Sequence, residues 1–137
     1  MNGIAAPIVA VESAAAPDFL AARPSVSVVM VVFMTGVALT ESVACALGDP
    51  LVDELVIVDN GSTEADAAGL RALAERDGRV ALLAGHGNIG FARGANLGAR
   101  TAKGEVLVFL NPDAFLQPGC IAALARAVGA ASRRQAP

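Results

Sequence analysis

The stretch ELVIVDNGSTEADAAGLRALAERDG, residues 54–78, contains one complete strand-and-helix unit. Its first six residues are an apolar run that closes on Asp59, as expected for a strand buried on both faces. Residues 64–78 then have the composition of a helix, with acids in the first turn and Thr63 at the cap position. A buried strand that leads at once into a helix predicts an α/β fold.

The same order recurs on both sides of this unit. The expected strands cover residues 26–33, 54–59, 79–84 and 105–111, and the expected helices cover residues 36–47, 64–78, 91–104 and 118–131. Each unit is about 25 residues long, which is the length that a crossover helix between parallel strands requires. We therefore predict a Rossmann-like three-layer sandwich around one mostly parallel sheet, with the first strand central.

The composition suits one compact domain. The chain has 137 residues, of which 55% are apolar and 17% charged, so it can bury a core made mainly of Val, Leu and Ile. Its net charge of −3 argues against nucleic acid, whose binding needs a basic stripe. We expect a loose leader over residues 1–25, the domain over 26–131 and a polar tail over 132–137.

Neither the cysteines nor the apolar runs indicate export. Cys45 and Cys120 have no metal or redox spacing and are interpreted as buried, reduced thiols. The longest apolar run, residues 26–39, is shorter than the roughly 20 residues that span a bilayer, and no secretory signal is visible. We expect a cytoplasmic protein without a transmembrane segment, with the membrane surface as the alternative location.

The ends of the expected strands carry the candidate functional residues. In parallel sheets, ligands bind at the carboxyl ends of the strands, near the point where the strand order reverses. Asp59 ends the second strand, where a carboxylate can accept hydrogen bonds from a base imide or a ribose hydroxyl. The alternative is a plain turn, because Asn60, Gly61 and Ser62 are common turn residues.

A glycine-rich segment follows the third strand. Gly85, Gly87 and Gly90 match the G-x-G-x-x-G dinucleotide fingerprint. That loop normally opens a dinucleotide domain, however, and here two complete units precede it. His86 is interpreted as an ordinary loop histidine.

Polar side chains stand at the start of the helix that follows. Arg93 can pair with a phosphate through two hydrogen bonds, although a solvated surface arginine is the alternative. Asn88 and Asn96 lie on either side of it in the sequence.

The fourth strand runs into Asn111-Pro112-Asp113. Pro112 cannot donate to the sheet and therefore ends the strand, and it keeps Asn111 extended. Asp113 is thereby presented at the edge of the sheet. A hard divalent cation takes one or two protein carboxylates and fills its other positions with further oxygens, so this turn is a candidate metal site. A strand-ending proline turn is the alternative.

Four stretches, taken together, resemble a known enzyme family. They are SVSVVMVVFMTG (25–36), ELVIVDNGST (54–63), GNIGFARGANLGARTAKGE (87–105) and VLVFLNPDAFLQPG (106–119). In this order they look like the nucleotide-sugar half of a family 2 glycosyltransferase with a GT-A fold, over roughly residues 25–130. The Asn-Pro-Asp form is most similar to the rhamnosyltransferase-type branch.

This resemblance implies roles for the strand-end residues. Asp59 would contact the base of a UDP- or dTDP-sugar such as dTDP-rhamnose, and Asn111 would lie near the ribose or the metal. Asp113 would bind Mg2+ or Mn2+ that bridges the diphosphate. The donor pocket would also contain Asn88, Gly90, Arg93 and Asn96. The fourth run would be a central strand that delivers the metal ligand. Sugar would pass with inversion to a saccharide or lipid-linked acceptor, as in cell-wall or polysaccharide synthesis.

Two departures from the family leave alternatives open. The family usually has polar residues and a tyrosine near the end of its first strand, where this chain has Val32-Phe33-Met34. Members also continue beyond this length, and the missing half would supply the acceptor site and the catalytic base. We find no catalytic residue in this chain and expect a truncated donor half that self-associates. A non-catalytic nucleotide-binding module and an NAD-type domain remain as alternatives.

Overall fold

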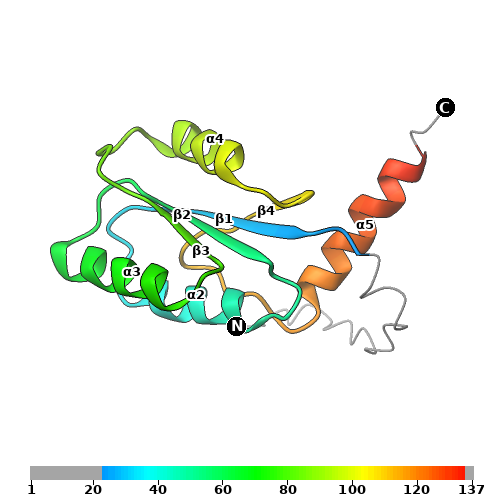
Figure 1. The fold of residues 1–137 in the computed structure, drawn as a ribbon, viewed down its shortest axis with the longest axis horizontal. Coiled ribbons are helices and arrows are strands. Elements are labelled where there is room, and N and C mark those ends of the chain that lie inside the picture. The colour runs from blue at the N-terminus through cyan, green and yellow to red at the C-terminus, as the bar shows by residue number, and fades with distance from the viewer. Residues whose placement is uncertain (1–22, 135–137) are drawn as a thin grey trace, which may run out of the picture.

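The computed structural model of the protein describes residues 23–134, in which four strands alternate with four helices (Figure 1). The elements are β1 (Val26–Val32), α2 (Ala38–Gly48), β2 (Glu54–Asp59), α3 (Glu64–Arg76), β3 (Val80–Leu83), α4 (Phe91–Thr101), β4 (Val106–Phe109) and α5 (Cys120–Arg134). Every expected strand and helix is present, with shorter bounds at most ends. Most of the expected leader and the end of the expected tail lie outside the described residues.

The strands form one sheet in the order β3-β2-β1-β4, and every neighbouring pair is parallel. This confirms the predicted α/β fold. Strand β1 is central, as expected, since Val29 pairs with Val56 of β2 on one side and with Phe109 of β4 on the other.

The prediction of a central fourth strand is wrong for this chain. Strand β4 lies at the edge of the sheet among the described residues. Leu107 and Phe109, which share one face of β4, are 36% and 54% exposed. A continuous apolar run is typical of a strand that is buried on both faces, but in β4 only Val106 and Val108 pack on the core, and no described strand lies beyond β4.

The helices divide between the two faces of the sheet. Val28 and Met30 of β1 pack on the side of α2 and α3, whereas Val29 packs with Leu97 of α4 on the opposite side. Figure 1 shows α2 and α3 beneath the sheet and α4 above it. Right-handed crossovers explain this division, because the connection from β3 to β4 runs back across the sheet in the reverse direction.

Two glycines explain how α4 packs onto the sheet. A Cβ atom on Gly98 would come within 2.5 Å of Val29 Cγ1, and one on Gly94 within 3.0 Å of Val31 Cγ1. Gly94 and Gly98 are also the buried residues of this helix. Glycine lowers helix propensity, yet here it is required on one face, because the four-residue spacing brings both glycines to the contact with β1.

The amino edge of the sheet is fixed by charged groups. Asp53 accepts hydrogen bonds from Arg23 Nη1 and Nη2 at 2.8 and 2.9 Å and from the Val26 N–H at 2.8 Å. The hydrogen bonds from Arg23 hold the pKa of the Asp53 carboxyl below its ordinary value. Glu105 accepts a hydrogen bond from the Ser25 N–H at 3.0 Å at this same edge. It therefore lies far from the carboxyl ends of the strands.

Neither the two cysteines nor the lengths of the described helices indicate a function. Cys45 and Cys120 are both free and half-buried, so they are less buried than expected. Among the described residues, no helix has both the length and the apolar character to cross a membrane.

Candidate functional site

The strand order reverses at β1, which has β2 and β3 on one side and β4 on the other. The carboxyl ends of β1, β2 and β4 are therefore the place where a ligand is expected in an open parallel sheet. Asp59 ends β2, and Asn111 and Asp113 follow β4, whereas Asn88, Gly90, Arg93 and Asn96 belong to the segment that follows β3.

Asp59 is buried at the end of β2, with 9% of the residue exposed. Its Oδ1 atom accepts hydrogen bonds from the Gly61 N–H at 3.0 Å and from Ser62 Oγ at 2.8 Å. The hydrogen bonds recorded for the described residues leave its Oδ2 atom without a donor. The turn therefore orients the carboxylate and keeps one of its oxygens available.

Phe33 lies beside this turn. Two atoms of its ring come within 3.1 Å of the position that a Cβ atom on Gly61 would take, and Phe33 is 56% exposed. Met34 donates its N–H to the Gly61 carbonyl at 3.1 Å and has a φ of 49°. The segment that departs from the family pattern thus places an exposed aromatic ring next to the Asp59 turn.

The glycine loop, residues 84–90, leads from β3 to α4. Gly85, Gly87 and Gly90 have φ values of 86°, 69° and 82°, a region that glycine adopts without the penalty paid by other residues. Asn88 Oδ1 accepts a hydrogen bond from the Gly90 N–H at 2.9 Å. Asn88 therefore caps a local turn with its oxygen, and its amide nitrogen remains for another partner.

Arg93 and Asn96 are both exposed on the first turns of α4. The buried face of this helix belongs to Gly94 and Gly98, so the polar side chains stand on its solvent side. Gly90 caps the helix without a side-chain hydrogen bond, and the first turn holds no acid. The start of α4 thus combines free backbone donors with a cation, which favours an anion nearby.

Asn60 is a residue that the sequence interpretation treated only as part of a turn. It is 3% exposed, and its side chain contacts the Gly90 carbonyl and His86. His86, which lies in the loop as expected, is a hydrogen-bond partner of Asn60. A polar side chain directly after a strand-ending carboxylate was the only signal for it, because the partners are 26 and 30 residues away.

The Asn111-Pro112-Asp113 segment forms a hydrogen-bonded turn, closed by the Ala114 N–H and the Asn111 carbonyl at 3.0 Å. Asn111 and Asp113 are both exposed. Ser42 Oγ donates to the Ala114 carbonyl at 2.6 Å and ties this turn to α2. Among the described residues, no group of three His, Cys, Asp or Glu side chains could hold a metal, so Asp113 would need oxygens from a ligand.

The structure therefore links some candidates and leaves others apart. Asn60 is hydrogen-bonded to the glycine loop, and its chain neighbour Asp59 is hydrogen-bonded to Gly61, so these residues form one local unit. Within residues 23–134, no recorded hydrogen bond joins Asp113 to that unit or to α4.

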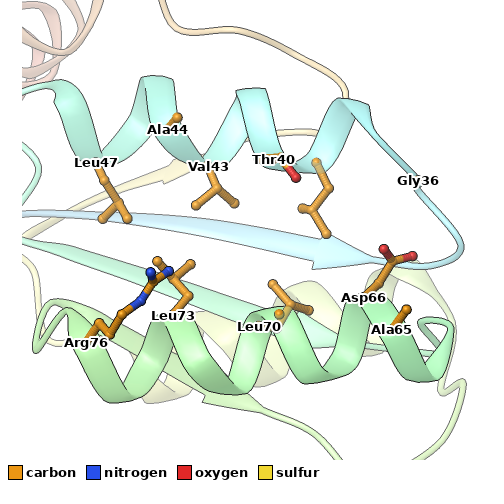
Figure 2. Close-up of a pocket in the computed structure, with 12 residues that line it drawn as sticks. Gly36, Thr40, Val43, Ala44, Leu47, Ala65, Asp66, Leu70, Leu73 and Arg76 are labelled. Carbon is orange, nitrogen blue, oxygen red and sulfur yellow. The ribbon is translucent and has the colours of Figure 1, made fainter.

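A separate groove of about 440 Å³ lies between α2 and α3. Val43 and Leu47 of α2 point toward Leu70 and Leu73 of α3, while Asp66 and Arg76 lie at opposite ends (Figure 2). None of the candidate residues lines it. Because its polar groups do not converge on one place, we assign function to the carboxyl edge of the sheet instead.

Comparison with known proteins gives a consistent family. The glycosyl transferase family 2 model matches residues 27–133. An uncharacterized glycosyltransferase of Haemophilus influenzae is 29% identical over 94 residues, which are 68% of this chain and 38% of that protein. Glycosyltransferase GlyG of Streptococcus pneumoniae is 31% identical over 100 residues, which are 72% of this chain and 33% of that protein.

Solved structures share the fold. Mannosyltransferase PcManGT from Pyrobaculum calidifontis, in complex with GDP-Man and Mn2+, is similar with a TM-score of 0.64 and 28% identity, covering 77% of this chain and 32% of that chain. S. aureus TarS 1-349 in complex with UDP-GlcNAc has a TM-score of 0.66 at 17% identity, covering 77% and 31%, which supports the fold alone.

This chain spans about a third of the length of the proteins that it matches. The family match nevertheless extends over most of the chain, from β1 into α5, and includes the strand-end residues described above. The chain belongs to glycosyltransferase family 2.

Proposed function

We propose that this chain binds a nucleoside-diphosphate sugar together with a divalent metal ion at the carboxyl edge of its sheet. The observation that carries the proposal is the pairing of a buried carboxylate, Asp59, with the exposed ring of Phe33 across Gly61. PcManGT was solved with GDP-Man and Mn2+, which supports this ligand class. The donor proposed here is a UDP- or dTDP-sugar, with dTDP-rhamnose as the specific candidate.

The base is the part that Asp59 and Phe33 recognise. Uracil and thymine carry an imide N–H, which can donate to the available Oδ2 atom of Asp59. An aromatic ring offers a stacking surface worth about 1–3 kcal/mol per base. Cytosine has an acceptor where uracil has the imide N–H, so a carboxylate repels it. This geometry favours UDP and dTDP over CDP.

The diphosphate lies between α4 and the Asn111–Asp113 turn. The Arg93 guanidinium donates two hydrogen bonds to a phosphate. Asn88, Gly90 and Asn96 line the same side of the donor pocket. Asp113 holds Mg2+ or Mn2+ with one carboxylate, and Asn111 adds an amide oxygen or contacts the ribose. An exposed carboxylate with an amide beside it fits a cation that takes most of its ligands from phosphate and water. When bound, the metal supplies Lewis-acid stabilisation of the leaving diphosphate.

The chain is a donor-binding domain over residues 26–131 that does not transfer sugar unaided. Inverting transfer needs a general base within hydrogen-bond reach of the acceptor hydroxyl. In this proposal Asp59 binds the base and Asp113 the metal, and Glu105 lies at the opposite edge of the sheet. A nucleotide-binding module without catalytic activity is the second candidate, and it is favoured for this chain alone because Asp59 and Asp113 both have binding roles in this proposal.

Calorimetry with UDP, dTDP, CDP and NAD, each with and without Mn2+, tests the proposal. UDP or dTDP should bind more tightly when Mn2+ is present, CDP should bind at least tenfold more weakly, and NAD should not bind. Tight NAD binding that is independent of metal would instead support the dinucleotide-binding hypothesis and overturn this one.

A further inference from the structure

Asn60 is a buried polar side chain that the proposed donor site does not itself use. Its Nδ2 atom donates to the Gly90 carbonyl at 3.0 Å, and its Oδ1 atom lies 3.2 Å from His86 Nε2. A carbonyl oxygen can only accept, so Nδ2 must face Gly90. Oδ1 then requires a donor, and His86 supplies it with the Nε2–H tautomer. The glycine loop therefore satisfies both ends of one amide.

The same residue is fixed to the sheet. The Asn60 N–H donates to the Val32 carbonyl at 2.8 Å, and Asn60 directly follows Asp59 at the end of β2. Asn60 therefore joins the ends of β1 and β2 to the glycine loop. In the described part of the chain, the recorded hydrogen bonds between the glycine loop and the end of β2 both run to Asn60.

The contact extends to the first turn of α4. The Gly90 carbonyl also accepts from the Gly94 N–H at 3.0 Å, so the atom held by Asn60 begins the helix. A Cβ atom on Gly94 would lie 3.2 Å from Asn60 Nδ2, which means that a glycine at this place lets the amide approach. Arg93 belongs to this same turn.

The glycine loop needs such an anchor. Its three glycines have positive φ values, and their added Cβ atoms would meet nothing within 4 Å. Glycine loses more conformational freedom on ordering than any other residue. The two hydrogen bonds from Asn60 to the loop offset part of this entropy loss.

We propose that Asn60, with His86, is a positioning residue for nucleotide binding. It holds the start of α4 at a fixed distance from the end of β2, so that Arg93 and Asp59 are already in place when a nucleotide arrives. This inference rests on the proposed function, because the ligand must bridge both elements. Without Asn60 the loop would have to be ordered during binding, and this ordering would reduce the affinity.

The test compares Asn60→Ala with variants of its partner. Asn60→Ala removes both hydrogen bonds and should weaken binding of UDP with Mn2+ about tenfold or more. His86→Ala removes one of them and should have a smaller effect in the same direction. His86→Gln keeps an N–H donor near the position of Nε2 and should restore most of the affinity. Thr63→Ala is the matched control, because it deletes a hydrogen bond of 3.2 Å at the cap of α3 without touching the loop.

Hydrogen exchange in the absence of nucleotide provides the second readout. Backbone amides of residues 85–94 should exchange faster in Asn60→Ala, whereas amides of β1 should be unchanged. Thr63→Ala should leave residues 85–94 like the parent. If Asn60→Ala does not fold, His86→Ala decides the same question.

The outcomes separate the two proposals. If the parent binds UDP, either parent-like exchange or parent-like UDP affinity in both Asn60→Ala and His86→Ala would overturn the positioning role. A parent protein that binds no nucleotide would overturn the proposed function, and the positioning role for a nucleotide would fall with it.

Discussion

Gly98 of α4 lies against Val29 of β1 so closely that a Cβ atom added to the glycine would come within 2.5 Å of Val29 Cγ1. Val58 Cγ2 lies 3.2 Å from the same position. Both valines are buried, with 1% or less of each exposed. The missing side chain thus sets how near α4 can approach the sheet.

Gly98→Ala should destabilise the protein. Valine is stiff at χ1 and cannot turn away, so the helix must shift, and overpacking of this kind costs about 1–3 kcal/mol. Gly69→Ala is the control, because Gly69 is a helical glycine of α3 whose added Cβ atom would meet nothing within 4 Å. It should stabilise the helix by up to about 1 kcal/mol. Urea denaturation of both variants measures this, and equal effects would contradict the close packing.

Asp113→Asn should abolish the increase in UDP affinity that Mn2+ produces. The substitution keeps the shape of the side chain and removes the charge that a divalent cation requires. The thermal midpoint should stay near that of the parent, because Asp113 is exposed in a loop. Calorimetry with and without Mn2+ measures the effect, with Asp113→Ala as a second variant. If both Asp113 variants kept the metal dependence of the parent, Asp113 would not bind the metal and the segment would be only a structural turn.

Asp53 should make the stability of the protein sensitive to acid. The hydrogen bonds from Arg23 lower the pKa of Asp53 in the folded state, so its contribution is fully present above the unfolded value of about 3.9. That contribution is lost as the pH falls through the lower folded pKa. Asp53→Asn should therefore be less stable than the parent near neutral pH, with a smaller difference at about pH 3. Denaturant titrations at both pH values measure this, and a constant difference would contradict it.

The chain should self-associate through the uncovered side of β4. Leu107 and Phe109 are exposed on this edge strand, and Leu124 and Val128 are exposed on α5. Exposed apolar side chains and an unpaired strand edge favour association with a second copy. Sedimentation velocity should show a dimer or larger species, and Phe109→Lys should shift it toward the monomer. Val37→Lys is the control, because Val37 is 94% exposed and lies away from β4 in the sequence.

The chain alone should not transfer sugar at a useful rate. Transfer requires an acceptor held in line with the donor carbon and a base beside its hydroxyl, and in the proposed site Asp59 contacts the nucleobase and Asp113 the metal, which leaves neither for that role. The assay is release of UDP or dTDP from a panel of nucleotide sugars, with and without saccharide acceptors. Robust turnover that depends on an acceptor would show that a neighbouring subunit or another carboxylate supplies the base.

The sequence by itself determined the order of elements, the parallel sheet and the set of strand-end residues. Residues 54–59 form a strand with the bounds expected from their apolar run, and Thr63 caps the next helix by accepting the Asp66 N–H at 3.2 Å. These features depend on neighbours within a few residues, so local patterns suffice to predict them.

Only the tertiary structure decided which long-range partners meet. The edge position of β4, the approach of Gly98 to Val29, the ring of Phe33 against Gly61 and the hydrogen bonds of Asn60 to Gly90 and His86 all join residues that are far apart in the sequence. Such contacts depend on how the crossovers place each helix and loop against the sheet. The hydrophobic periodicity of a sequence predicts only which residues are buried. It does not distinguish an asparagine that anchors a distant loop from one that only follows the end of a strand.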